Sequence, residues 1–534
     1  MTTTNMMPVA DGTAPGSSLE PLAGLVGGPR VDHLLTAAAR RAPDRVALRS
    51  ATEEISYAAL EALTDRCAAM VQGLVDGPGE VVAIAGLMDP EFAPLFFGIS
   101  RAGNASAVLN PFLPAERLAH VLTTSGARVA VLSPEMYERI AEVRGRAPLL
   151  ETVVLTRRTE GLDALPTLDE LLAAAPGSAD PAGVTEDPDA LACLQFTSGT
   201  TGSAKACRLS HRNLTVNAAQ TVYAQQVDES SVVFNCLPTF HLMHLTLAVT
   251  AVATHVLWPG ADSVASVRAA DRLRATHYYS LPVRLSRLAA DPLLTGLEAP
   301  ALRAILSGGS SLPKQAALAL AQQFGVPVVQ GYGLAETSPS MHLGTPDRPK
   351  PGSCGQAVPG GETRIIDVDT REVLPAGAKG EIQVRGPQLM QGYLGQPGSR
   401  SRGRPGAGTA RGAPTRPTAV PVPPVRRHRC PDPRPARRAE GGERPVPTGR
   451  DRPVSPWPAS GRSAVRCPVP YRREASRADG SPPAGERKPS PARRRARRSR
   501  TTRTAPSSVS RRCPPWSAAE ALRAVRGRRA AAGP

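Results

Sequence analysis

The sequence changes character abruptly after Gln396, and this change limits the size of the folded part. Residues 401–534 contain no Ile, Phe, Met, Asn or Gln, a single Leu, a single Lys and 24 of the chain's 55 prolines. A segment of this composition cannot bury enough apolar surface to offset the conformational entropy lost on folding. We therefore predict that residues 397–534 are disordered and that the compact domain lies before them.

Charge divides the chain at the same place. Residues 401–534 hold 33 basic and 8 acidic residues, a net charge of +25, whereas residues 1–400 hold 31 basic and 38 acidic residues, a net charge of −7. The overall charge of +18 and the isoelectric point near 10.3 thus describe the C-terminal segment alone. We expect no nucleic-acid binding by the folded part, because such binding requires a basic surface.

Two explanations of the C-terminal segment are open. It is either a genuine Arg- and Pro-rich tail or an out-of-frame translation of GC-rich DNA, which yields Arg, Pro, Ala and Gly and loses residues with AT-rich codons. Natural basic tails normally mix in Lys and Ser with repeated motifs, and we find no repeat here. This favours the frameshift, and the nucleotide sequence beyond codon 396 distinguishes the two.

Cysteine usage and the N-terminus indicate a cytoplasmic protein with reduced thiols. The eight cysteines are scattered, without a C-x-x-C pair, so we expect neither a zinc site nor a disulfide framework. The first basic residue is Arg30, which argues against a secretory signal, and no apolar run has the length of a membrane span. Residues 1–27, rich in Thr, Pro, Gly and Ser, are predicted to be a disordered lead-in.

Between residues 28 and 396, short apolar runs alternate with helical patterns, which predicts an α/β domain with stacked, mostly parallel sheets and helices on both faces. A Pro/Ala/Asp-rich linker over 176–188 interrupts the alternation. The predicted strands are 81–85, 106–109, 128–132, 152–156, 191–196, 232–237, 254–258, 277–281, 304–307 and 326–330. Beyond Gly352, two turn-bounded strands at 363–368 and 380–385 predict a small antiparallel β subdomain.

The sharpest signal is the segment 194–214, LQFTSGTTGSAKACRLSHRNL. It follows a predicted strand, and a run of Gly, Ser and Thr leads to Lys205 and to a helix expected to begin near Ser210. Glycines let successive backbone N–H groups turn toward an anion, hydroxyls add donors, and the lysine adds a positive charge. The Walker pattern G-x-x-x-x-G-K-[ST] cannot be laid on it. We predict a phosphate-binding loop, with an ordinary polar loop as the alternative.

This segment resembles the phosphate loop of the AMP-forming adenylating superfamily, which comprises acyl-CoA synthetases, aryl-CoA ligases and adenylation domains. In that superfamily TSGTTG followed by P-K-G holds the β- and γ-phosphates of ATP. The resemblance implies that the corresponding residues here are Thr197, Ser198, Gly199, Thr200, Thr201, Gly202 and Lys205. Ala204 and Ala206 replace the usual Pro and Gly, which should loosen the loop without removing a phosphate ligand.

Two glycine-rich motifs of the superfamily follow in the expected order. SGGSSLP (307–313) resembles the turn beside the adenine, which implies that Gly308, Gly309 and Ser310 bind the nucleotide. GYGLAETSP (331–339) resembles the adenine platform, and its residues Gly331, Tyr332 and Gly333 are implied to bind the nucleotide, with Tyr332 against the adenine ring.

The resemblance also implies four residues in the chemistry. LPTFH (237–241) resembles the segment whose histidine and neighbouring aromatic residue line the acyl pocket, so His241 is assigned there. Lys205 is assigned to the phosphates, Thr337 to the α-phosphate and Glu336 to Mg²⁺, a hard cation that prefers oxygen ligands.

The resemblance spans about residues 31–396, from DRVALRS near the N-terminus to GEIQVRGPQLMQGYL at 380–394. The superfamily then continues into a T-G-D segment whose Asp binds the ribose, a hinge with an Arg, and a small C-terminal domain whose Lys orients the substrate carboxylate. None of these is recognisable after residue 396. This break inside a motif supports the frameshift explanation, and we expect impaired activity from the chain as written.

By resemblance, the activity is ATP-dependent conversion of a carboxylic acid to acyl-AMP and then to a thioester with coenzyme A or with the phosphopantetheine of an acyl carrier protein. Amino-acid-activating members place an Asp just after the strand that ends here at Phe240. His241 to His244 stand there instead, so a fatty or aryl acid is expected. The alternatives are a non-catalytic protein that binds ATP or an acyl group, with a basic tail contacting nucleic acid or an acidic partner, and an amino-acid adenylation domain.

Overall fold

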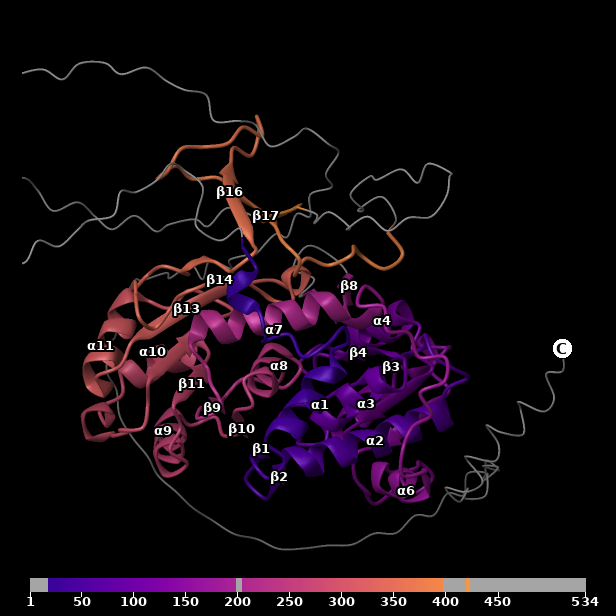
Figure 1. The fold of residues 1–534 in the computed structure, drawn as a ribbon. Helices are drawn as coiled ribbons and strands as arrows, with labels where there is room; N and C mark the ends of the chain where they lie inside the picture. The colour runs from indigo at the N-terminus through magenta and orange to yellow at the C-terminus, as the bar shows by residue number, and fades with distance from the viewer. Residues whose placement is uncertain (1–17, 198–203, 397–418, 423–534) are drawn as a thin grey trace, which may run out of the picture.

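The computed structural model describes residues 18–197, 204–396 and 419–422. Figure 1 shows two bodies of sheet and helix side by side, with the long helix α7 (His211–Gln225) lying across both. The predicted α/β class with mostly parallel sheets is confirmed. Within the described ranges, no helix is both long and apolar enough to cross a bilayer.

The first body is built on a six-stranded sheet in the order β6-β5-β3-β4-β7-β8, parallel except for β8. Its strands are apolar nearly throughout, because helices cover both faces of a parallel sheet. They are β3 (Val81–Ile84), β4 (Ala105–Val108), β5 (Val129–Leu132), β6 (Thr152–Leu155), β7 (Leu191–Phe196) and β8 (Ala206–Ser210).

The second body is built on a nine-stranded sheet in the order β15-β14-β13-β12-β11-β9-β10-β1-β2. The strands from β13 to β1 in this order run parallel, and β2, β14 and β15 add antiparallel edges. The strands are β1 (Val46–Arg49), β2 (Glu54–Ser56), β9 (Val232–Asn235), β10 (Thr254–Leu257), β11 (His277–Ser280), β12 (Ala304–Ser307), β13 (Val328–Gly333), β14 (Ser340–Leu343) and β15 (Gln356–Ala357).

The helices cover these sheets and fill the space between them. Besides α7, the α-helices are α1 (Asp32–Arg41), α2 (Tyr57–Leu74), α3 (Phe92–Arg101), α4 (Ala115–Ser125), α5 (Pro134–Ala141), α6 (Leu168–Ala174), α8 (Met243–Thr250), α9 (Ser263–Arg272), α10 (Pro282–Ala289) and α11 (Lys314–Phe324). Gly98 is required where α2 and α3 pack together, since a Cβ there would lie 2.7 Å from the Cβ of Cys67.

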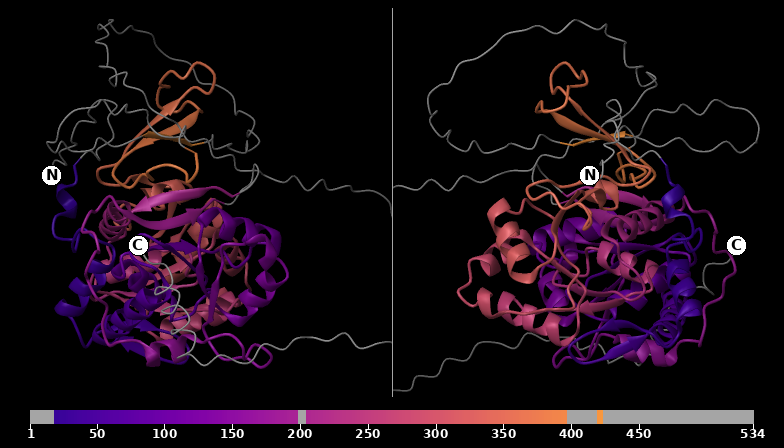
Figure 2. Two further views of the ribbon diagram at one scale, coloured as in Figure 1. Left: turned by 90° about the vertical axis from the view of Figure 1, so that its right-hand side faces the viewer. Right: turned by 60° about the vertical axis from the view of Figure 1, so that its left-hand side comes forward.

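The predicted small β subdomain is present and projects from the rest of the domain (Figure 2). It consists of β16 (Glu362–Ile366), β17 (Glu381–Arg385) and β18 (Ala419–Val422), all antiparallel. β18 lies inside the segment 397–534 that we predict to be disordered, so the structure differs there: an edge strand such as β17 offers unpaired backbone groups to a neighbouring segment. The rest of 397–534 lies outside the described residues.

The predicted lead-in also differs in part. Residues 18–27 include a short 3₁₀ helix, η1 (Glu20–Leu22), which packs on α7 with Leu22 buried. The composition of residues 1–27 does not predict this contact, because it depends on the burial of a single leucine, Leu22. Residues 1–17 lie outside the described residues.

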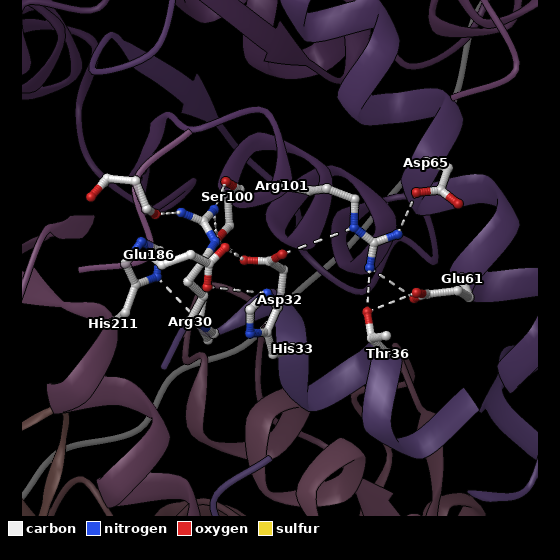
Figure 3. A network of polar contacts seen from close by, with 12 residues as sticks. Arg30, Asp32, His33, Thr36, Glu61, Asp65, Ser100, Arg101, Glu186 and His211 are labelled. Atoms are coloured by element: carbon white, nitrogen blue, oxygen red, sulfur yellow. Dashed lines mark hydrogen bonds and ion pairs between the residues drawn. The ribbon is translucent and has the colours of Figure 1, made fainter. Parts of the chain in front are cut away.

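A buried polar network joins the start of α1 to α3 and α7 (Figure 3). The Arg30 side chain is 2% exposed; its Nε donates to Asp32 Oδ1 at 3.1 Å, and it also donates to the carbonyls of Thr185 and Ser100. The Ser100 hydroxyl donates to the same Asp32 oxygen at 2.6 Å. Through Thr185, this network anchors the predicted 176–188 linker to the first body.

Candidate functional site

The predicted phosphate loop lies in the sequence between β7 and β8, which pair antiparallel. The Thr197 N–H donates to the Lys205 carbonyl at 3.0 Å, and the Lys205 N–H donates to the Thr197 hydroxyl at 3.1 Å. The predicted ligands Ser198, Gly199, Thr200, Thr201 and Gly202 lie outside the described residues. The helix that we expected to begin near Ser210 is present, with Ser210 as its N-cap, and β8 lies between the loop and this helix. α7 begins only at His211, so the helix N-terminus lies too far along the chain to add its dipole to the loop.

β8 is held on both sides, which fixes the base of this loop. It pairs with β7 on one side, and on the other it is hydrogen-bonded to the backbone of residues 391–394. The three backbone hydrogen bonds on that second side run from Gln391 to Arg208, from Arg208 to Gly392 and from Leu394 to Ala206, each at 2.9 Å. Lys205 therefore directly precedes an edge strand whose outer side is covered by residues 391–394.

Tyr393 joins two of the predicted site residues. The Lys205 ammonium lies 5.0 Å from the centroid of the Tyr393 ring, within the range of a cation–π contact. The Tyr393 hydroxyl donates to Glu336 Oε1 at 2.7 Å. Lys205 and Glu336, 131 positions apart in the sequence, are thus brought to opposite parts of one side chain.

Sequence analysis did not single out Tyr393. The residue stands in GEIQVRGPQLMQGYL, which we matched to the superfamily as strand sequence without assigning a role to its tyrosine. A buried tyrosine normally finds a partner for its hydroxyl, and that expectation is the only local signal that the sequence offers.

Glu336 and Thr337 lie in η4 (Ala335–Thr337), a single 3₁₀ turn. The Glu336 side chain is buried, and its carbonyl accepts from the Met390 N–H at 3.0 Å. The Thr337 hydroxyl accepts from the Leu334 N–H at 3.0 Å and donates within the same turn. Thr337 therefore stabilises the turn that presents Glu336, and its contact with an α-phosphate stays a prediction.

The two glycine-rich motifs meet at the carboxyl ends of β12 and β13, which are parallel neighbours. A Cβ placed on Gly308 would lie 3.8 Å from the Gly331 carbonyl, so the two backbones approach closely. Gly309 has φ +87°, a conformation that favours glycine, and the neighbouring Ser310 is exposed. The structure therefore brings the predicted adenine turn against the predicted adenine platform.

The platform itself depends on a second close approach. A Cβ on Gly333 would lie 1.9 Å from the Pro339 carbonyl oxygen, so no larger residue fits there without movement. Tyr332 is half-buried, with its ring 6.4 Å from the His342 ring on β14. A cavity of about 310 Å³ adjoins the start of this platform and is lined by residues that include Gln330, Leu343 and Lys350.

The predicted acyl segment lies at the end of β9. His241 is exposed, with its ring 4.3 Å from that of Phe240, and Phe240 meets Phe112 edge-on at 6.2 Å. The Ser340 hydroxyl donates to the Met243 sulfur at 3.2 Å, which ties this segment to the chain that follows Glu336.

His244 is buried. It belongs to the stretch 241–244, in which the lack of an aspartate predicts an uncharged acyl group. Its ring lies edge-on to Tyr279 at 5.0 Å, and desolvation lowers its pKa to about 3. A neutral imidazole is therefore present at physiological pH, and it cannot pair with a substrate charge as an aspartate would.

The donor set fits a magnesium nucleotide. Across the described ranges, no group of three or more His, Cys, Asp or Glu side chains is placed to hold a metal by itself. A Mg²⁺ ion would therefore rely on the Glu336 carboxylate together with phosphate oxygens, as is usual for this hard ion. Lys205 supplies the positive charge on the same side of the site, and the glycine backbones leave room for a flat base.

Comparison with known proteins identifies the family of the chain. The sequence profile of the family described as AMP-binding enzyme matches residues 35–394. A 4-coumarate–CoA ligase from Oryza sativa subsp. japonica is 30% identical over 359 residues, 65% of this chain and 64% of that enzyme. A feruloyl-CoA synthase from Amycolatopsis sp. is 30% identical over 371 residues, 67% of this chain and 70% of that enzyme.

A solved structure of similar fold is the ATP-bound MatB from Rhodopseudomonas palustris, with a TM-score of 0.60 and 27% identity over 69% of this chain and 72% of that one. This chain spans less than two thirds of the length of the rice ligase. The profile match nevertheless covers most of the chain, including both glycine-rich motifs and the Lys205 hairpin. The chain therefore belongs to the AMP-binding enzyme family.

Proposed function

We propose that this protein activates a carboxylic acid with ATP, giving acyl-AMP and pyrophosphate, and that the acyl group then passes to a thiol. The observation that carries the proposal is the placement of Lys205 and Glu336 on one tyrosine side chain. A lysine beside a carboxylate is the pairing that a magnesium polyphosphate needs, since one charge meets phosphate oxygens and the other meets the metal.

In the proposed step, a substrate carboxylate oxygen attacks the α-phosphorus of ATP, a new P–O bond forms, and pyrophosphate leaves with the electron pair of the broken P–O bond. No proton moves, so positioning and charge neutralisation lower the barrier. Lys205 would neutralise charge on the departing β- and γ-phosphates. The Glu336 carboxylate would hold a Mg²⁺ ion, whose positive charge would help to neutralise the phosphates. The turn at Gly308 and the ring of Tyr332 would hold the adenine.

The proposed substrate is an aryl acid, with a fatty acid as the second candidate. The aromatic group of Phe240, His241 and Phe112 supports this assignment, because aromatic rings pack well against one another. Relatives named for 4-coumarate and ferulate act on aromatic acids, which supports it further. The absence of an aspartate over 241–244 disfavours an amino-acid substrate.

The proposed acceptor is coenzyme A, in keeping with the names of the relatives, with a carrier-protein phosphopantetheine as the alternative. We also propose a cytoplasmic location, on the ground of the scattered cysteines. The non-catalytic alternative, in which the domain only holds ATP, differs from the favoured proposal in one respect: it gives no pyrophosphate.

The decisive experiment measures pyrophosphate release by the full chain with 4-coumarate, octanoate or phenylalanine as substrate. We expect release to be slow, because the T-G-D aspartate and the terminal lysine of the superfamily are not recognisable in this sequence. Among the three acids, we expect release to be fastest with 4-coumarate. Faster release with phenylalanine would transfer the assignment to an amino-acid adenylation domain. ATP binding without release by any acid would support the non-catalytic alternative.

A further inference from the structure

The stretch 387–394, here called the closing segment, lies across two parts of the site that are distant in sequence. It contacts β8 and α7 on one side and the η4 turn on the other. Its hydrogen bonds are Asn213 Nδ2 to the Pro387 carbonyl at 2.7 Å, the Ser338 hydroxyl to the Gln388 carbonyl at 2.9 Å, the Met390 N–H to the Glu336 carbonyl at 3.0 Å, and the Gln391 N–H to the Arg208 carbonyl at 2.9 Å.

Tyr393 is the side chain of the closing segment that reaches the two predicted charged groups. It is 6% exposed, with its hydroxyl 2.7 Å from Glu336 Oε1 and its ring centroid 5.0 Å from Lys205 Nζ. We infer that Tyr393 is a positioning residue for magnesium-ATP, holding the Glu336 carboxylate through its hydroxyl and the Lys205 ammonium through its ring. This inference rests on the proposed function.

The two contacts depend on different parts of the tyrosine. The hydroxyl donates a hydrogen bond to a carboxylate, a charge-assisted contact that fixes how the carboxylate is turned. The ring face attracts a cation through its quadrupole, which a phenylalanine ring also provides. Lys205 is exposed and would otherwise sample many rotamers, so the ring narrows the region that its ammonium occupies.

Substitution can therefore separate the two roles. Tyr393→Phe removes the hydroxyl and keeps the ring, whereas Tyr393→Leu removes both. Tyr57→Phe is a matched control, because Tyr57 is also buried and its hydroxyl donates to the Ala253 carbonyl at 2.7 Å, outside the candidate site. A general loss of one buried hydroxyl hydrogen bond affects the control and the test variant alike.

The experiment measures ATP affinity of the full chain by titration calorimetry, once with excess Mg²⁺ and once with EDTA. For Tyr393→Phe we expect affinity about five- to tenfold lower with Mg²⁺ and unchanged with EDTA, because only the metal depends on Glu336. For Tyr393→Leu we expect both affinities to fall, since Lys205 also loses its support. Tyr57→Phe should keep the wild-type ratio of the two affinities.

The outcomes separate this inference from the proposed function. If wild-type protein binds no ATP under either condition, the proposed function fails and this inference fails with it. If wild-type protein binds and Tyr393→Phe keeps the wild-type ratio, the inference alone is overturned. Because each ratio is taken within one variant, and the binding stoichiometry gives the folded fraction, partial unfolding cannot imitate the expected result.

A second measurement tests the same coupling through Glu336. Glu336→Gln should lower the affinity with Mg²⁺, and adding Tyr393→Phe to it should produce no further loss, because the two residues act on one metal contact. Additive losses in the double variant would show that the Tyr393 hydroxyl acts on nucleotide binding through some route other than Glu336, and would overturn the hydroxyl role.

Discussion

The Tyr393 hydroxyl donates a 2.7 Å hydrogen bond to the carboxylate of Glu336, across 57 positions of sequence. The Lys205 ammonium lies over the same ring, 5.0 Å from its centroid. Two motifs that the sequence presents as independent, the phosphate loop and the GYGLAETSP segment, are therefore parts of one arrangement that the closing segment completes.

Lys205→Ala should weaken ATP binding by about tenfold or more, because a charge-assisted phosphate contact contributes about 1.5 to 3 kcal/mol. Calorimetry on the full chain measures the change. Lys379→Ala removes an exposed lysine on the small β subdomain and should leave the affinity as it is. Equal affinities for wild type and Lys205→Ala would remove the phosphate assignment.

Arg30→Met should lower the free energy of unfolding by about 3 to 5 kcal/mol, since it removes the closer guanidinium partner of the buried Asp32 carboxylate and leaves only Arg101, whose Nε lies at 3.9 Å. Arg41→Met is the control: Arg41 pairs with Glu229 at 2.8 Å, but its side chain is 66% exposed, so the loss should stay within about 1 kcal/mol. Urea unfolding followed by circular dichroism gives both values. Similar losses for the two variants would show that the network in Figure 3 is not a stabilising element.

Gly333→Ala should disturb the adenine platform, because the added methyl group would overlap the Pro339 carbonyl oxygen. Overpacking of this kind costs about 1 to 3 kcal/mol, which should appear as a lower thermal midpoint and weaker ATP binding. Gly296→Ala, where an added Cβ meets nothing within 4 Å, is the matched control. A Gly333→Ala protein as stable and as tightly binding as the control would mean that the strand moves aside without cost.

Stability should fall as the pH drops from 6.5 toward 4. Burial and the nearby Arg30 lower the pKa of His211 to about 4. The unfolded chain therefore binds a proton at this histidine near pH 6.5, whereas the folded chain binds it only near pH 4. Titration of this histidine removes up to about 3 kcal/mol of stability as the pH falls from 6.5 to 4, at 1.36 kcal/mol per pKa unit. Desolvation shifts the pKa of five other histidines in the same direction, His244 to about 3 and His241, His255, His277 and His342 to about 4.

His211→Gln tests this assignment, because glutamine keeps an acceptor for the Val31 N–H and does not titrate. The slope of unfolding free energy against pH between 6.5 and 4 should decrease by up to one proton relative to wild type. An unchanged slope would mean that His211 titrates alike in the folded and unfolded states.

The buried parallel strands could be predicted from sequence, because helices on both faces leave them as uninterrupted apolar runs. The predictions for 191–196 and 304–307 coincide with β7 and β12 to the residue. β8 could not be predicted in the same way, since Arg208 stands in its middle and its second partner, residues 391–394, lies far along the chain.

The site residues show the same division. Lys205, Glu336 and the glycines stand in motifs that local sequence reveals, and the structure brings Lys205 and Glu336 together. Tyr393 contacts both residues, but this role could not be predicted from the local sequence, because tertiary packing determines the partners of Tyr393. The Ser210 cap at the start of α7 was predictable, because Ser210 and Asn213 satisfy each other's backbone N–H groups within one turn.

The pairing of Ala206 with Leu394 has a consequence for the order in which a newly made chain acquires its site. The β7–β8 hairpin leaves the ribosome early, but its outer partner follows roughly 190 residues later, a delay of about 10 to 40 s at 5 to 20 residues per second. Throughout that interval β8 presents an open edge, and Lys205 has no aromatic neighbour from the closing segment. A nascent chain arrested before residue 391 would thus carry both glycine-rich motifs and still lack the assembled site, which is completed only by the last few residues of the domain.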